Sequence, residues 1–271
     1  MKKADVKNDQ YYTKPSLAKS CIRYVKKELL DANKVIEPSA GSGSFLNNLI
    51  DYNPIGFDID PQSEDVIKQD FLEWENENDD NDVCFIGNPP FGKCSSLAIK
   101  FFNHCAEQGA KYICFIVPNT FRKNSVMNRL NLDFHLEREM KIEKDSFELL
   151  DGTSYSVPCS FQVWHRKEFK REKVKIIKEI EDWKWVSKED SPNYAIRRVG
   201  ANAGKIFEFN KAISNSSHYF IKADPDVYES FKKMFVSLYS KENDNTSKWN
   251  TAGNPSLSKH EIIEDYKNFK G

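Results

Sequence analysis

Short apolar runs alternate with helical stretches over the first 165 residues, and this alternation restricts the fold more than any other feature of the sequence. Strands and helices that alternate along a chain are typical of an α/β fold with a parallel sheet. The apolar runs predict strands at 34–37, 55–58, 66–68, 83–86, 112–117 and 160–164. Apolar residues at helical spacing predict helices at 16–30, 44–50 and 95–108.

Charge is divided unevenly along the chain. The 271 residues include 40 basic and 41 acidic side chains, for a net charge of −1. Residues 1–165 hold 19 basic and 25 acidic side chains (net −6), whereas residues 166–271 hold 21 and 16 (net +5). We therefore predict two domains, 1–165 and 166–271. The near-zero total argues against a nucleic-acid binder that relies on bulk positive potential, although it hides a modestly basic second part.

Several protein classes are excluded by what the sequence lacks. No apolar run approaches the ~20 residues of a membrane span. The charged N-terminus leads into no apolar segment of the kind that secretory signals contain. The six cysteines form no CxxC pair and lie at no zinc spacing with histidine. We expect reduced, mostly buried thiols, no metal site, no membrane partner and a cytoplasmic location.

A glycine-containing loop at 37–43, with the sequence Glu-Pro-Ser-Ala-Gly-Ser-Gly, follows the first predicted strand. Gly41 and Gly43 allow a tight turn and a close approach of the backbone to a ligand. The helix predicted after the loop would offer its N-terminal amides. The loop lacks the GxGxxG spacing of dinucleotide sites and the Lys-Ser/Thr ending of phosphate loops. It suits a cofactor with a sugar and a charged amino acid, or it is a plain structural turn.

Two acidic residues follow at the ends of the next predicted strands. Asp58 ends the strand 55–58, where a carboxylate can accept hydrogen bonds from both hydroxyls of a ribose. Asp70 and Phe71 follow the third strand, and a carboxylate beside an aromatic ring can bind the exocyclic amine of adenine and stack on its ring. Taken in this order, the loops describe an adenosine pocket along the strand ends.

The most specific motif is Asn88-Pro89-Pro90-Phe91, directly after the strand 83–86. Two prolines fix the backbone and remove two N–H donors, so that nearby carbonyl groups are left without partners. The Asn88 side-chain oxygen and the Pro89 carbonyl can then accept both hydrogens of a planar amino group, which directs the nitrogen lone pair at an electrophile. Phe91 supplies a flat surface for the ring that carries the amine, and such stacking is worth ~1–3 kcal/mol.

In this order the motifs resemble those of the S-adenosylmethionine-dependent amino-methyltransferases, and most of all the adenine-N6 DNA methyltransferases. The resemblance covers about residues 9–165 and implies a Rossmann-like, class I methyltransferase sheet of seven strands with a reversed last strand, 160–164. It rests on Gln10-Tyr11-Tyr12-Thr13, EPSAGSGSF at 37–45, GFDID at 56–60, QDF at 69–71 and NPPF at 88–91. The family's commonest fourth residue in the last motif is Tyr or Trp, and Phe91 keeps the stacking surface without a hydroxyl.

The resemblance implies a role for each motif residue. S-adenosylmethionine would be the cofactor and S-adenosylhomocysteine its product. The residues expected to hold the cofactor are Tyr11, Tyr12, Thr13, Glu37, Pro38, Ser39, Gly41, Gly43, Asp58, Asp70, Phe71 and Asn88. Those expected to act in methyl transfer are Asn88, Pro89, Pro90 and Phe91.

The second part of the chain is expected to be a small recognition region for a DNA substrate. Arg197, Arg198 and Lys205 surround flexible glycines and suit contacts to phosphates. An adenine inside a duplex cannot reach Asn88, so it would have to be flipped out of the helix. A solvated basic face is the plainer explanation of these cations.

Three other functions remain open at this stage. The same NPP geometry accepts a protein glutamine amide, although the basic, aromatic second part favours a nucleic acid. Adenine in RNA is the second, because sequence alone separates it poorly from adenine in DNA. The third is a binding module without catalysis, against which the intact Asn88, Asp70 and Gly41 argue.

Overall fold

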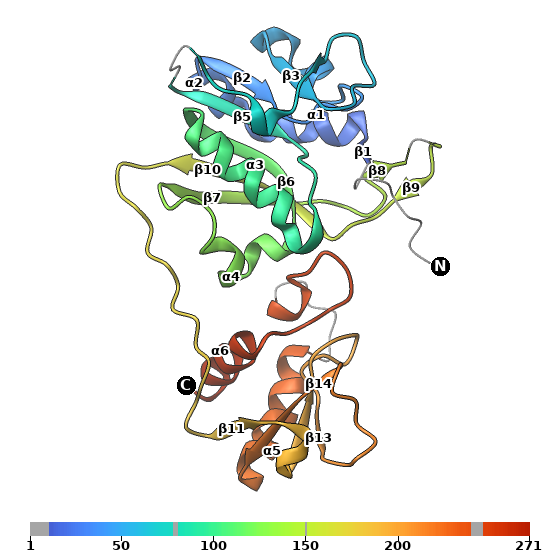
Figure 1. Ribbon diagram of the computed structural model, residues 1–271, viewed down its shortest axis with the longest axis vertical. Helices are drawn as coiled ribbons and strands as arrows, with labels where there is room; N and C mark the ends of the chain where they lie inside the picture. The colour runs from blue at the N-terminus through green and yellow to red at the C-terminus, as the bar shows by residue number, and fades with distance from the viewer. Residues whose placement is uncertain (1–10, 78–80, 150, 240–245) are drawn as a thin grey trace. The chain divides into compact units, whose positions relative to one another are not determined.

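The computed structural model describes residues 11–77, 81–149, 151–239 and 246–271. In this part the chain divides into two compact units (Figure 1). The first unit comprises the described residues up to Phe121 together with Ser125–Lys173. The second comprises Arg122–Asn124 and Val174–Gly271.

The contact boundary between the units falls at 173/174, whereas the charge changes at 165/166. The intervening residues are tied to the first unit by backbone hydrogen bonds. Lys167 N donates to Asp133 O at 2.8 Å, and Arg171 N donates to Leu132 O at 2.9 Å. The first basic residues after Trp164 therefore belong structurally to the acidic unit.

A seven-stranded sheet forms the centre of the first unit. From edge to edge its strands are β4 (Ile67–Lys68), β3 (Ile55–Asp58), β2 (Lys34–Glu37), β5 (Val83–Gly87), β6 (Ala110–Pro118), β10 (Cys159–Arg166) and β7 (Phe134–Lys141). The pairs from β4 to β6 are parallel, while β10 is antiparallel to both of its neighbours. The predicted α/β fold, with seven strands and a reversed last strand, is confirmed.

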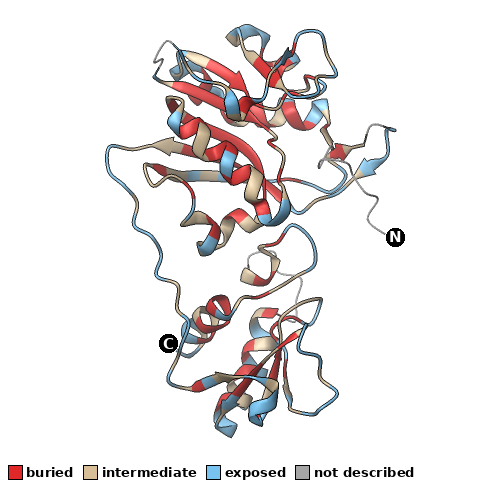
Figure 2. Cartoon of the chain, viewed as in Figure 1, coloured by how far each residue is buried: buried red, intermediate tan, exposed pale blue. Residues whose placement is uncertain are grey.

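The central strands carry the hydrophobic core of this unit. In β5 every residue is buried, and in β6 all but Lys111 are. Figure 2 shows this concentration of buried residues along the middle of the sheet. Strands buried on both faces read as continuous apolar runs, which is why the sequence revealed them.

Helices cover the sheet largely where the sequence predicts them. The helix α3 (Ser96–Glu107) agrees with the predicted 95–108, whereas the predicted helix 16–30 is two helices, α1 (Pro15–Tyr24) and α2 (Lys26–Asp31). They are separated at Val25, whose φ of −113° and ψ of 24° leave the helical region. A short α4 (Asn124–Met127) follows β6. Among the described residues, no helix has the length and apolar character that crossing a bilayer requires.

The helix predicted at 44–50 is wrong. The segment forms turns and two short 3₁₀ helices, Leu46–Asn48 and Ile50–Tyr52. Asn48 bonds to the backbone of the segment itself, since its Nδ2 donates to Ser44 O at 2.8 Å. Asn53 then ends the segment in the left-handed region at φ 48°. The loop 37–43 is therefore not followed by an α-helix N-terminus.

A small second sheet lies beside the large one and has no counterpart in the predicted elements. Its strands are β1 (Tyr12–Thr13), β8 (Phe147–Glu148) and β9 (Ser154–Tyr155). Tyr12 pairs with Glu148, and Phe147 pairs with Tyr155, all antiparallel. The segment around Tyr12 is thus held by a hairpin from far along the chain.

The second unit is an antiparallel sheet packed against helices. Its strand order is β11 (Trp183–Val186), β14 (His218–Ala223), β12 (Tyr194–Arg197) and β13 (Ile206–Glu208). The helices are α5 (Pro225–Met234), continued by a π-helical turn at Phe235–Tyr239, and α6 (Lys259–Lys270). A separate core includes Trp183, Ile221, Phe231, Ile262 and Ile263.

Candidate active site

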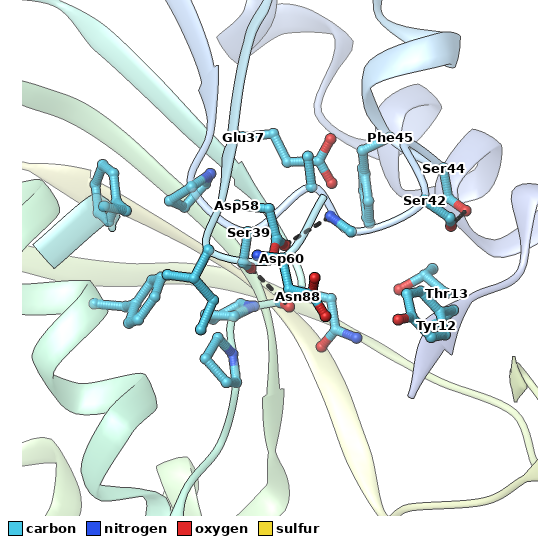
Figure 3. A pocket seen from close by; sticks show the side chains of 18 of the residues that line it. Tyr12, Thr13, Glu37, Ser39, Ser42, Ser44, Phe45, Asp58, Asp60 and Asn88 are labelled. Atoms are coloured by element: carbon cyan, nitrogen blue, oxygen red, sulfur yellow. Dashed lines mark hydrogen bonds between the residues drawn. The ribbon is translucent and has the colours of Figure 1, made fainter. Parts of the chain in front are cut away.

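A cavity of about 250 Å³ opens at the carboxyl ends of β4, β3, β2 and β5. The strand order reverses beside β2, because β3 and β4 extend to one side while β5 and β6 extend to the other. Open α/β sheets bind ligands at such switch points. Of the predicted site residues, those that line the cavity are Tyr11, Tyr12, Thr13, Glu37, Pro38, Ser39, Gly41, Asp58, Asp70, Phe71, Asn88, Pro89 and Pro90 (Figure 3).

The loop after β2 folds tightly against the loop after β3. Gly41 has a φ of 51°, and its N–H donates to Asp58 Oδ2 at 2.8 Å. A Cβ atom on Gly41 would lie 3.1 Å from Tyr12 Cε1, so the tyrosine packs directly on the glycine backbone. Gly43, at φ 78°, donates to Ala40 O at 2.7 Å and does not line the cavity. Gly41 therefore shapes the cavity, whereas Gly43 shapes the turn.

Glu37 is a buried carboxyl group at the end of β2. Its side chain is 2% exposed, and Oε2 accepts a hydrogen bond from Leu46 N at 2.8 Å. Burial raises the pKa of Glu37 well above its ordinary value, and the nearby Asp58 raises it further. One acceptor site is thus used to fix the loop, and the group faces the cavity in a poorly solvated setting.

Asp58 organises the loops with both of its oxygens. Oδ2 accepts from Gly41, and Oδ1 accepts from Asp60 N at 2.8 Å. Each carboxylate oxygen can accept more than one hydrogen bond, so Asp58 retains acceptor capacity toward the cavity. Burial and the charges of Asp58 and Asp60 raise the pKa of the neighbouring Tyr12, whose hydroxyl remains a donor at neutral pH.

Asp70 and Phe71 follow the carboxyl end of β4, and their side chains lie in different environments. Asp70 Oδ1 caps a 3₁₀ turn by accepting from Leu72 N at 2.9 Å. Phe71 is only 1% exposed and stacks on Trp74 with ring centroids 5.8 Å apart. Phe71 thus belongs mainly to the core and can present only a small part of its ring to the cavity.

Asn88 follows β5 and has an unsatisfied side chain. Its Oδ1 atom is buried, with no hydrogen-bond partner among the described residues. The Asn88 main-chain carbonyl accepts from Ser39 Oγ at 3.1 Å, which ties the loop after β5 to the loop after β2. Leaving a buried acceptor unpaired costs about 1–3 kcal/mol. Beside Pro89 and Pro90, this oxygen is an acceptor for a donor that the described part of the chain does not supply.

Phe91 does not line the cavity, unlike the three residues before it. It is 6% exposed and meets Tyr11 edge-on, with ring centroids 5.4 Å apart. Tyr11 in turn contacts Phe147 and Tyr155 at similar distances. The stacking role expected of Phe91 therefore stays a prediction. Gln10, the first residue of the same N-terminal motif, lies outside the described residues.

The cavity also contains residues to which the sequence analysis assigned no role, most of them inside the quoted motifs. Asp60 and Ile59 follow Asp58 directly, and Ile59 is 59% exposed. Leu97 and Phe101 reach the cavity from α3, and no local motif marks them because their position depends on how the helix packs. The remaining ones are Ala40, Ser42, Ser44, Phe45, Gln69 and Leu72.

The three cations expected to contact substrate lie in the second unit. Arg197 Nε donates to Val199 O at 3.0 Å, and the Arg198 guanidinium lies 5.5 Å from the Tyr219 ring centre. Lys205 is exposed, with its ammonium 5.4 Å from the ring centre of Phe207. Arg198 and Lys205 lie in the loop between β12 and β13, and Arg197 immediately precedes it.

Neither a scan of protein-family models nor a search of curated proteins finds a match to this chain. Among solved structures, one similar chain is a protein provisionally described as an RNA methyltransferase from Pyrococcus horikoshii. It is 13% identical, with a TM-score of 0.46 over 62% of this chain and 92% of that one. Another is the modification subunit of a provisionally described type I restriction enzyme from Vibrio vulnificus YJ016. It is also 13% identical, with a TM-score of 0.44 over 60% of this chain and 46% of that one. Because both scores are below 0.5, any function has to be argued from the cavity itself.

Proposed function

We propose that this protein transfers the methyl group of S-adenosylmethionine to the N6 amino group of adenine in DNA. The observation that carries the proposal is the buried Asn88 Oδ1 atom, which has no partner among the described residues and lies at a cavity of the sheet's switch point. A planar amine is a donor that would satisfy this acceptor.

The residues of the cavity fit the proposed cofactor. Asp58 and Asp70 offer carboxylate oxygens, and Gly41 brings backbone close to the cavity without a side chain in the way. Tyr12 packs over that glycine and holds a hydroxyl donor beside the two loops. When bound, S-adenosylmethionine supplies an electrophilic methyl group on a sulfonium ion.

The work of the protein in this proposal is to align the amine. Asn88 Oδ1 and the Pro89 carbonyl would each accept a hydrogen bond from one of the two amine N–H groups. This leaves the nitrogen lone pair free to face the methyl group. Proline at 89 and 90 restricts the backbone that presents these acceptors. Alignment of this kind is worth up to ~7–11 kcal/mol in ideal intramolecular reactions, so no covalent nucleophile is needed.

The choice of a nucleic acid over a protein rests on the net charge of +5 over residues 166–271 and on the cations around one loop of that region. The choice of DNA over RNA rests on the resemblance of the motifs to those of the adenine-N6 DNA methyltransferases. A duplex adenine would have to be flipped out to reach Asn88, at a cost of a few kcal/mol. The deciding experiment incubates the full-length protein with methyl-labelled S-adenosylmethionine and DNA, RNA or protein. Digestion of the product should yield N6-methyladenine from DNA. Label in RNA or in glutamine alone would replace the DNA proposal.

Substitution of Asn88 tests whether its unpaired Oδ1 acceptor is needed for methyl transfer. Asn88→Ala removes the acceptor and should abolish transfer while leaving the calorimetric affinity for S-adenosylmethionine within a few-fold of the parent's. Asn88→Asp keeps an acceptor oxygen at the same place and should retain measurable transfer. Full activity of Asn88→Ala would remove the basis of the proposal.

A further inference from the structure

The loop between β12 and β13 is unusually well fixed for a surface segment. Arg197 N donates to Lys205 O, and Gly204 N donates back to Arg197 O, both at 2.8 Å. Inside the loop, Ala203 N donates to Gly200 O at 2.8 Å and Lys205 N donates to Asn202 O at 3.0 Å. We call residues 198–204 the pinned loop.

A second set of bonds attaches the pinned loop to the C-terminal part of the same unit. Lys248, 3% exposed, donates from Nζ to Ala201 O at 2.7 Å and to Tyr239 O at 2.8 Å. Gly200 N donates to Pro255 O at 2.8 Å. A buried ammonium is costly unless it is hydrogen-bonded, so Lys248 holds the loop backbone in one place.

Gly204 closes the pinned loop against an aromatic ring. Its φ is 93°, which favours glycine, and a Cβ atom at this position would overlap the ring of Tyr239. Tyr239 is 1% exposed and donates to Asp265 through its hydroxyl. The loop therefore rests on a buried, hydrogen-bonded ring and has little freedom to move.

The surroundings of the pinned loop are positively charged. Residues 191–207 contain no acidic side chain, but they contain Arg197, Arg198 and Lys205. Lys184 and Lys222 are directly paired across β11 and β14, both exposed, on the same face of the sheet as Arg197 but toward the opposite end of β12 from the pinned loop. Neither lysine forms an ion pair with a described residue, but Lys222 is close enough to Asp190 to help lower the pKa of that carboxyl group. Two like charges placed directly opposite each other repel and destabilise the sheet. The phosphates of a nucleic-acid backbone would offset this repulsion.

Asn202 is the uncharged polar side chain that the pinned loop presents. Asn202 and its neighbour Ala201 are exposed, whereas Ala203 is fully buried. The Asn202 carboxamide makes no hydrogen bond to any described residue. An asparagine amide can donate to and accept from a base edge at once, most often on adenine, and a good pair of such bonds distinguishes bases by about 5- to 150-fold.

We propose that the pinned loop reads a DNA base edge through Asn202, while Arg197, Lys205 and the lysine pair contact phosphates. The inference rests on the proposed DNA methylation and adds which residue sets sequence preference. A rigid loop suits this role because its ordering cost is met by folding and not by binding. Phosphate contacts position a protein on DNA without specifying sequence.

The test is a methylation assay on a library of duplexes randomised around one adenine. Asn202→Ala should lower the preference at one base position by about 5- to 150-fold, with the rate on disfavoured sites and the salt dependence of binding unchanged. The matched control is Asn215→Ala, an exposed asparagine elsewhere in the unit, which should keep the parent's preference. An Asn202→Ala enzyme with the parent's preference would overturn the inference.

Failure of the proposed function gives a different result. If the parent methylates no DNA, the proposed function is wrong. If it methylates DNA without any sequence preference, the proposed function stands and the role of the pinned loop is wrong. Gly204→Ala tests the rigidity, with its fold checked by circular dichroism. A folded Gly204→Ala enzyme should lose the same preference as Asn202→Ala, and an unchanged preference would show that the fixed backbone is irrelevant to reading.

Discussion

At the scale of single residues, the cavity contains groups kept in unfavourable states. Glu37 holds a carboxyl group where burial opposes ionisation, and Asn88 holds an acceptor without a partner. A folding chain with no further task would gain stability by replacing either one. Sites that bind or react often carry such costs.

Replacing Glu37 should therefore stabilise the protein. The pKa of Glu37 is raised in the folded state, so its contribution to stability is fully present below about pH 4.3 and is lost as pH rises toward the folded value. Glu37→Gln keeps an acceptor for Leu46 N and removes the titration. Thermal unfolding should show a higher midpoint than the parent's at pH 8, and the difference should disappear near pH 4. Equal midpoints at pH 8 would contradict this.

The backbone at Gly41 should not tolerate a side chain. Gly41→Ala forces a non-glycine residue to φ 51° and brings Cβ to 3.1 Å from Tyr12. The left-handed conformation costs roughly 1–2 kcal/mol, and displacement of Tyr12 should weaken calorimetric binding of S-adenosylmethionine at least several-fold. Gly152→Ala is the control, because Gly152 has a φ of 80° with nothing within 4 Å. Gly152→Ala should lose stability but keep the parent's affinity for S-adenosylmethionine. Equal affinity of the Gly41→Ala and Gly152→Ala variants would show that displacement of Tyr12 does not matter for binding.

At the scale of elements, burial decides what the sequence could predict. The strands β3, β5 and β6 were visible as apolar runs because both of their faces are covered. β7 was missed because it is an edge strand. Along it, exposed charged residues such as Glu137 and Lys141 alternate with more buried residues, so no apolar run forms. The helix expected after Gly43 was wrong: two short 3₁₀ helices stand there, with a local bond from Asn48 Nδ2 to Ser44 O.

The same limit applies to the cavity. Loops at strand ends need particular residues, so EPSAGSG, GFDID and NPPF could be recognised in sequence. The contributions of Leu97 and Phe101 could not, because they depend on the packing of α3. The burial of Phe91 and Phe71 is likewise a property of tertiary packing and not of their motifs.

The lysine pair of the second sheet predicts a stability effect at this scale. Lys184 and Lys222 are directly opposed, so Lys184→Glu should stabilise the fold by roughly 0.2–1 kcal/mol at low salt. The gain should fall as salt screens the pair. Lys211→Glu, at an exposed lysine outside the strands, is the control. Urea unfolding at low and high ionic strength measures both, and a gain that is independent of salt would contradict the electrostatic cause.

At the scale of the whole molecule, the cysteines divide sharply by accessibility. All six are free and lie in the first unit, five of them buried, while Cys94 is exposed. Burial raises the pKa of the Cys159 thiol to about 12 and holds those of Cys105 and Cys114 well above their ordinary value. Reactivity requires a thiolate, so the buried thiols should be inert in the folded protein.

Thiol titration checks this division. The native protein should react with one equivalent of a thiol reagent quickly at pH 8, and with six after denaturation. Cys94→Ser should remove the fast equivalent without changing the buried five. A second fast thiol in the native parent would show that the core opens more readily than its packing suggests.

The fit of Gly204 against Tyr239 also bears on how this chain can vary. Positions 204, 239 and 248 fix a backbone and should accept few substitutions, while the exposed positions 201 and 202 are bound only through their main chain. A saturation library over residues 201–204 should show that substitutions are tolerated at 201 and 202 but not at 204. A lineage could thus exchange the presented side chain repeatedly without rebuilding the scaffold beneath it.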